Sequence, residues 1–179
     1  MMSPTGSATA ARVPDGALAM VEFVRSLPYA RPSARTTAAM LAERRGTCST
    51  KHAFLHQVLS EHFPELEPKL VHRVYEVSRQ HARVRFGSKV SDTVPCDGLM
   101  DVHRFLEIRL HGRPIRIDAT FPGPPWDGAT SMPLACGAGE DHPVGGDPDE
   151  EKRALESEHC DPRAREPFIA ALSAVTAKQ

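Results

Sequence analysis

The chain has 179 residues, a formal net charge of −1 at pH 7, 40% hydrophobic residues and 25% charged residues. This length is typical of one domain with its own core, and the balanced charge excludes a global field that would draw the chain to nucleic acid or to an anionic membrane. Its apolar runs fall well short of the ~20 residues that a membrane-spanning helix needs, so we expect no membrane partner.

The N-terminal segment differs in composition from the rest of the chain. Residues 1–14 are small and polar, which predicts a flexible leader followed by a single domain over 15–179. The leader lacks the basic and apolar regions of a signal peptide, so we expect no secretion signal. The four cysteines form no CxxC pair, which favours free thiols in a reducing compartment. We therefore expect a cytoplasmic protein.

Three helices are predicted in the first third of the chain. An aspartate followed by apolar residues at helical spacing predicts a helix over 15–27. A second helix is predicted to start after Ser33, and Gly46 breaks it. Thr47 is a good N-cap residue and predicts a third helix over 48–62.

The rest of the chain combines strand-like and helical patterns with segments rich in Gly and Pro. In chain order we predict a strand over 70–77, a loop or ragged strand pair over 79–100, a hairpin with strands over 102–110 and 113–120, a long surface loop over 122–146, and closing helices over 149–158 and 163–177.

Cys48 opens the third helix directly after Gly46 and Thr47. The N–H groups of the first helical turn have no partner within the helix, and the helix dipole favours negative charge there. A thiol at this place has a lowered pKa, and the same N–H groups can hold an oxyanion formed by attack on a carbonyl. Cys48 is therefore a candidate nucleophile. The alternative is a small buried residue at a helix start.

The predicted hairpin brings an imidazole and a carboxylate together. A turn at 111–112 pairs Leu110 with Arg113 and makes His103 and Asp118 diagonal neighbours on one face, within side-chain reach. A slip of one residue would mix polar and apolar faces. The apolar side chains that share the opposite face are Leu106, Ile108, Leu110, Ile115 and Ile117.

A carboxylate beside an imidazole fixes the tautomer of the ring and stabilises its charged form. A histidine held in this way can take the proton of a nearby thiol. The residues of a Cys-His-Asp triad are therefore present as Cys48, His103 and Asp118. The pattern alone does not show that the start of the third helix reaches His103.

The segments GTCSTKHAFL and DVHRFLEIRLHGRPIRIDAT resemble the core of the transglutaminase-like superfamily. The resemblance covers about residues 34–122 and leaves 123–179 as a C-terminal loop and helices. It implies an α+β, papain-like fold in which N-terminal helices, with the catalytic cysteine at a helix start, pack on an antiparallel β-sheet. It also implies Cys48 as nucleophile, His103 as general base and acid, and Asp118 as orienting carboxylate.

The chain departs from the superfamily pattern at two positions. Phe105 stands where a tryptophan is often found, and Ala119 stands where a proline often follows the aspartate. Neither change removes a catalytic group. The superfamily contains cross-linking transferases, peptidases, amidases and members without activity, and this chain has no room for the added β-domains of the cross-linkers.

The function expected from this resemblance is that of a small bacterial-type thiol hydrolase or acyltransferase. It would attack an amide or peptide bond of a peptide, a protein or a small amide and pass through a thioester. The alternative is a non-catalytic binding or scaffold module that kept the fold and the triad residues. The oligomeric state is left open.

The sequence also contains residues that suit two other kinds of site. Cys48, His52 and His56 share a helix face and could bind a metal, but no second ligand pair follows, so we expect no metal and no cofactor. His52 is also a competing base for the thiol. Residues 69–89 hold six basic side chains and one acidic one, but only two aromatic residues accompany them. We therefore expect no nucleic-acid partner.

Overall fold

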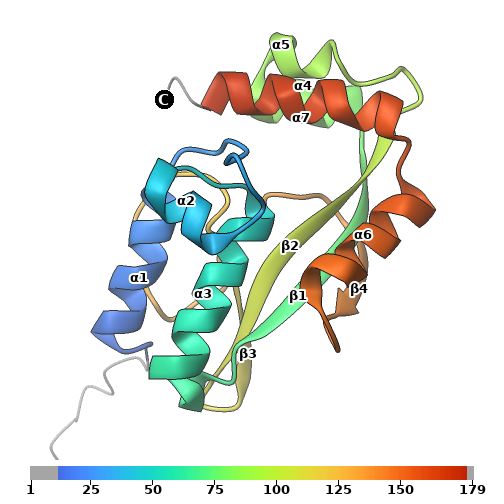
Figure 1. Ribbon diagram of the computed structural model, residues 1–179. Helices are drawn as coiled ribbons and strands as arrows, with labels where there is room; N and C mark the ends of the chain where they lie inside the picture. The colour runs from blue at the N-terminus through green and yellow to red at the C-terminus, as the bar shows by residue number, and fades with distance from the viewer. Residues whose placement is uncertain (1–11, 177–179) are drawn as a thin grey trace, which may run out of the picture.

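The computed structural model describes residues 12–176, and Figure 1 shows its elements. In chain order these are α1 (Asp15–Ser26), α2 (Thr37–Glu43), α3 (Cys48–His62), the 3-10 turn η1 (Pro64–Leu66), β1 (Lys69–Val77), α4 (Arg79–Phe86), α5 (Ser88–Ser91), β2 (Leu99–Leu110), β3 (Arg113–Ile117), β4 (Gly139–Pro143), α6 (Pro148–His159) and α7 (Pro162–Thr176). None of the helices described here is long and apolar enough to cross a membrane.

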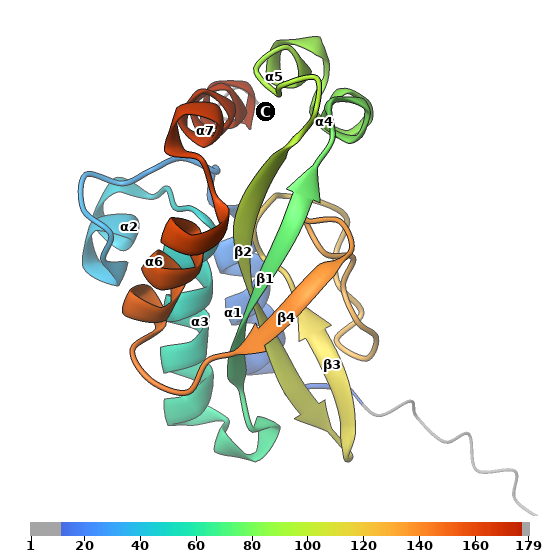
Figure 2. The same ribbon diagram turned by 90° about the vertical axis from the view of Figure 1, so that its right-hand side faces the viewer.

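The four strands form one antiparallel sheet in the order β3-β2-β1-β4. The α+β class is therefore confirmed. Figure 2 shows α3 and α6 on the same side of this sheet. The hairpin has the predicted register, with Leu110 opposite Arg113. Strand β3 ends at Ile117 rather than at residue 120, so Asp118 is the first residue after the strand.

The hairpin contributes its apolar face to the main core. Val21 of α1 and Leu55 and Leu59 of α3 are fully buried against Leu106 and Ile108 of β2. The other side chains predicted for this face, those of Leu110, Ile115 and Ile117, belong to the same cluster. A second core lies under α7 and holds α4 and α5 against the end of the sheet.

Part of the predicted leader belongs to the fold. Residues 1–11 lie outside the described residues, as do 177–179. Val13, however, is buried, and its N–H donates to the Gly128 carbonyl at 2.8 Å. The domain therefore includes at least one residue that the sequence assigns to the leader.

The second helix starts later than predicted. Thr36, not Ser33, is its N-cap, and the Thr36 hydroxyl accepts a hydrogen bond from the Ala39 N–H at 3.2 Å. The Ser33 N–H donates instead to the Glu43 carboxylate at 2.8 Å. Ser33 thus connects the segment between α1 and α2 to Glu43, the last residue of α2.

The prediction of a loop or ragged strands over 79–100 is wrong over its first half, where Arg79–Phe86 and Ser88–Ser91 form α4 and α5. Residues 92–98 are a loop, and β2 begins at Leu99. The Ser78 hydroxyl caps α4 by accepting from the His81 N–H at 3.1 Å, and Gly87 follows the helix with a φ of 87°. Ala82 is the buried residue of this helix. Because α4 buries a single side chain, its sequence lacks the apolar periodicity of a helix and resembles that of a loop.

The predicted surface loop over 122–146 contains one strand. Gly139–Pro143 pairs with β1, and an ion pair joins Arg73 to Asp141 at 2.6 Å. A Cβ on Gly139 would lie 2.1 Å from the Val74 carbonyl oxygen, so only glycine permits this approach. β4 carries no apolar alternation, and the hydrophobic pattern therefore does not reveal it.

Candidate active site

Cys48 is the first residue of α3, as predicted, and Thr47 is its N-cap. The Thr47 N–H donates to the Thr50 hydroxyl at 3.1 Å, which fixes the first turn. The preceding Gly46 is packed tightly, because a Cβ there would lie 2.8 Å from both Met40 Cγ and Thr50 Oγ1. The absence of a side chain at Gly46 therefore allows the backbone before α3 to pack directly against Met40 and Thr50.

The hairpin places His103 and Asp118 in direct contact. His103 Nε2 donates to Asp118 Oδ2 at 2.7 Å, and each of the two residues is about 5% exposed. Three further groups donate to the same carboxylate: the Thr120 N–H at 3.1 Å, the Thr120 hydroxyl at 2.5 Å and the Ala135 N–H at 2.6 Å. Asp118 is thus held in one orientation, and it fixes the His103 ring in turn.

The same contacts shift the pKa values of the pair in opposite directions. Burial alone would raise the pKa of Asp118, but the charge and hydrogen bond of His103 hold it well below its usual value. Burial alone would lower the pKa of His103, but Asp118 and the Cys48 thiol raise it well above 6.5. A protonated imidazole beside an ionised carboxylate is therefore the favoured state near neutral pH.

The thiol of Cys48 is the third member of this group. Burial would raise its pKa, but the charge of Lys152 and the hydrogen bond and charge of His103 lower it to about 5. Cys48 and His103 line the same small cavity, as the Cys-His-Asp prediction requires. A thiolate–imidazolium pair follows from this arrangement, and the thiolate is the reactive form of cysteine.

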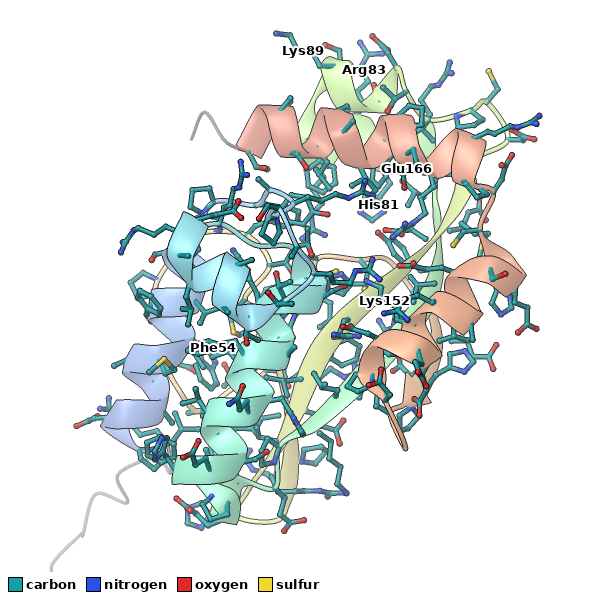
Figure 3. All side chains as sticks on the ribbon, in the orientation of Figure 1. Phe54, His81, Arg83, Lys89, Lys152 and Glu166 are labelled. Atoms are coloured by element: carbon teal, nitrogen blue, oxygen red, sulfur yellow. The ribbon has the colours of Figure 1, made fainter. Side chains whose placement is uncertain are left out.

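Lys152 is a site residue that the sequence analysis missed. Its Nζ donates to Cys48 Sγ at 3.4 Å and to Ser49 Oγ at 2.8 Å, and its side chain is only 2% exposed. Figure 3 shows Lys152 extending from α6 toward the N-terminal end of α3. One lysine in a strongly acidic helix carries no local signal for this role, because the contact spans 104 residues of the chain.

Arg104 fastens α6 to α3 and so holds Lys152 in place. The guanidinium, which is fully buried, donates to the Ser49 carbonyl at 3.0 Å on α3. It also donates to the Pro148 carbonyl at 2.6 Å and the Asp149 carboxylate at 2.7 Å at the start of α6. Because Arg104 follows His103 on β2, one strand positions both neighbours of the thiol.

His52 has a structural position that excludes the role of competing base. Its Nε2 accepts from the Ala119 N–H at 2.9 Å, so its Nδ1 carries the proton and donates to the Cys48 carbonyl at 2.8 Å. Burial lowers the pKa of His52 to about 4. The ring is therefore neutral and joins α3 to the residue after Asp118.

Lys51 makes a second buried connection between α3 and the segment after β3. Its Nζ donates to the carbonyls of Leu27 at 2.5 Å, Thr120 at 2.9 Å and Ala119 at 3.3 Å. Burial lowers the pKa of Lys51 to about 7, against the opposing effect of Asp118. Lys51 and His52 together fix the distance between the helix start and the hairpin end.

The other candidate ligands and thiols do not join this site. Among residues 12–176, no group of three His, Cys, Asp or Glu side chains is arranged to hold a metal ion. The four cysteines are free thiols, and Cys96 is exposed. Burial raises the pKa of Cys136 and raises that of Cys160 to about 11, so Cys48 differs from both.

A cavity of about 100 Å³ opens beside the thiol and is lined by Cys48 and the first turn of α3. A much smaller cavity of about 20 Å³, lined by Cys48, His103 and aromatic side chains, lies beyond it. The larger surface hollows of about 340 and 490 Å³ do not reach Cys48. A small group can therefore approach Sγ from the first cavity.

Comparisons of this chain with protein-family models, with curated proteins and with solved structures gave no match.

Proposed function

We propose that this protein is a thiol-dependent hydrolase or acyltransferase that acts on an amide or peptide bond through Cys48, His103 and Asp118. The observation that carries the proposal is the buried 2.7 Å bond from His103 to Asp118 beside a cysteine at a helix N-terminus. The arrangement fits a papain-like, transglutaminase-like core, with α3 against an antiparallel sheet.

The first half of the proposed reaction forms a thioester. His103 holds the proton of the Cys48 thiol, and the thiolate attacks the carbonyl carbon of the substrate. The carbonyl oxygen becomes an oxyanion beside the Cys48 N–H at the start of α3. When the tetrahedral intermediate collapses, His103 gives its proton to the departing amine, and the acyl group remains on Sγ.

The second half releases the acyl group. His103 takes a proton from water or from an acceptor amine, which attacks the thioester carbonyl. The bond to Sγ breaks, and the product is a carboxylic acid or a new amide. Asp118 keeps the His103 ring in one tautomer through both halves, and Lys152 stabilises the thiolate between turnovers.

The proposed location is a reducing compartment, the cytoplasm, on the basis of the four free thiols.

The proposal is tested by the pH dependence of iodoacetamide labelling at each cysteine, read by peptide mass spectrometry. We expect Cys48 to react with an apparent pKa near 5, far below the pKa values of Cys136 and Cys160, which burial raises. His103→Ala should raise that apparent pKa, whereas His81→Ala, which changes an exposed histidine of α4, should not. Equal profiles at all four cysteines would contradict the triad.

A second measurement separates an enzyme from a binding module. With p-nitrophenyl acetate as a generic acyl donor, an enzyme should release nitrophenolate repeatedly and carry an acetyl group on Cys48 during turnover. A module that kept the triad without turnover would acetylate once or not at all. His103→Ala should abolish the repeated release.

A further inference from the structure

The cavity beside Cys48 has an unusual charge. Besides the first turn of α3, its walls include Arg31, Arg35, Lys152 and Arg165. The arginines come from the segment before α2 and from α7, and the lysine comes from α6. Three separate parts of the chain thus bring positive charge to one cavity of about 100 Å³ next to the nucleophile.

Four cations line the cavity, and three carboxylates lie within 4 Å of them, those of Asp101, Glu156 and Glu166. Counted without the Cys48 thiolate, the excess is one positive charge. Glu156 is 3.1 Å from Arg165, 3.8 Å from Lys152 and 3.9 Å from Arg35. One carboxylate therefore serves three cations, of which Arg165 has a second partner in Asp101 at 2.5 Å.

Arg31 is already neutralised by a separate ion pair. Its guanidinium binds both oxygens of Glu166, at 2.7 and 3.0 Å. Within residues 12–176, Arg35 instead has only the contact with Glu156 at 3.9 Å, and its side chain is 38% exposed. Arg35 is thus the lining arginine with the most capacity to bind an incoming group.

The buried end of the cavity also favours an anion. The Lys152 side chain is buried, and its ammonium group donates to Cys48 Sγ and Ser49 Oγ. The N–H groups that begin α3 add the positive end of a helix dipole. In a partly buried cavity such charges are screened less than on the open surface.

We propose that this cavity binds a carboxylate of the substrate, next to the carbonyl that Cys48 attacks. Arg35 at the rim is the recognising side chain, whereas Lys152 at the base stays bound to Cys48 Sγ and Ser49 Oγ. The substrate is then an amide or peptide with a carboxylate close to the bond that is cleaved. The inference rests on the proposed function, because it assumes that Cys48 attacks a carbonyl from this cavity.

Two alkylating reagents of nearly equal size test the proposal. Iodoacetate carries a carboxylate and iodoacetamide a neutral amide on the carbon that the thiolate attacks, and each reaction forms an S–C bond and expels iodide. We expect the ratio of the iodoacetate rate to the iodoacetamide rate at Cys48 to exceed that of N-acetylcysteine by about tenfold or more at low salt. Added sodium chloride should reduce this excess.

A charge reversal at the rim identifies the recognising residue. Arg35→Glu should reduce the ratio to that of N-acetylcysteine or below. Arg83→Glu, an equal charge change at an exposed residue of α4 that does not line the cavity, should leave the ratio unchanged. Arg35→Gln, which adds no negative charge, should give an intermediate ratio.

The outcomes distinguish the two proposals. If iodoacetamide labelling of Cys48 depends on His103 but the ratio equals that of N-acetylcysteine, the triad stands and the carboxylate site is overturned. An unchanged ratio in Arg35→Glu also overturns it. If the ratio is high and responds to Arg35 but labelling does not depend on His103, the cavity binds anions and the proposed function fails. If neither reagent labels Cys48 in the folded protein, both proposals fail.

Discussion

Lys152 Nζ lies 3.4 Å from Cys48 Sγ, so the thiol has a second cationic neighbour besides His103. Most of the low pKa of a catalytic thiol is usually attributed to its histidine and its helix. Here a buried lysine from a distant helix adds a full charge at contact distance. This makes the contribution of each neighbour separately measurable.

Lys152→Met should raise the pKa of Cys48, because methionine fills a similar volume without the charge. We expect an increase of about one pH unit or more, as for a partner charge within hydrogen-bond distance. The pH profile of iodoacetamide labelling measures it. Lys89→Met, at an exposed residue of α5, is the matched control and should leave the profile unchanged. The same profile in both variants would show that Lys152 does not stabilise the thiolate.

Asp118→Asn should lower the pKa of His103, because the amide no longer favours the charged imidazole. The ion pair then loses population to the neutral thiol and imidazole, and the imidazolium is lost at lower pH than in the wild type. Labelling of Cys48 at pH 6 should fall by about tenfold or more, since one pKa unit corresponds to about 1.4 kcal/mol. Asp127→Asn, which changes an exposed carboxylate in the loop after β3, serves as the control. Labelling at the wild-type rate in Asp118→Asn would exclude an orienting role for this carboxylate.

His52→Gln should leave the labelling chemistry of Cys48 intact, because His52 bonds to the backbone and not to the thiol. Glutamine can donate to one backbone group and accept from the other, so we expect a loss in stability of about 1–3 kcal/mol from imperfect hydrogen bonds. Urea denaturation measures the stability, and labelling measures the reactivity. A large loss of Cys48 labelling in the folded variant would instead indicate that His52 acts as a base for the thiol.

Lys51 should give the protein a pH-dependent stability above neutrality. Its folded pKa of about 7 lies below the unfolded value of 10.5, so between these values the unfolded state binds the additional proton. Stability conferred by this group therefore rises with pH, by at most about 1.4 kcal/mol per pH unit.

Lys51→Met removes this titration. The difference in unfolding free energy between the wild type and Lys51→Met should therefore grow from pH 7 to pH 9, as measured by urea denaturation. Lys69→Met, at an exposed residue of β1, should show no such trend. A constant difference across this range would mean that Lys51 keeps its ordinary pKa in the folded protein.

The sequence predicted the parts of the site that depend on local or neighbouring structure. The register of the hairpin followed from its apolar alternation, and it brought His103 to Asp118 as expected. The start of α3 at Cys48 followed from Thr47 as a capping residue. Both predictions rest on interactions within about 20 residues, where spacing and propensity decide the geometry.

The missed features depend on contacts between distant segments. Lys152 and Arg35 gain their roles only when α6 and the segment before α2 meet at the start of α3. Arg104 shares a face of β2 with Leu106 and Ile108, which indicates burial, but the alternation does not show that its partners lie on α3 and α6. Charged side chains in such positions are stabilised by specific partners, and no hydrophobic period encodes those partners.

The attachment of α6 through Arg104 has a consequence for the order in which the protein becomes reactive during synthesis. Cys48, His103 and Asp118 all leave the ribosome before residue 152. Until α6 docks, the thiol lacks its lysine and remains closer to an ordinary cysteine. The charge environment of the nucleophile is therefore complete only after α6, which follows all three triad residues in the chain, has docked.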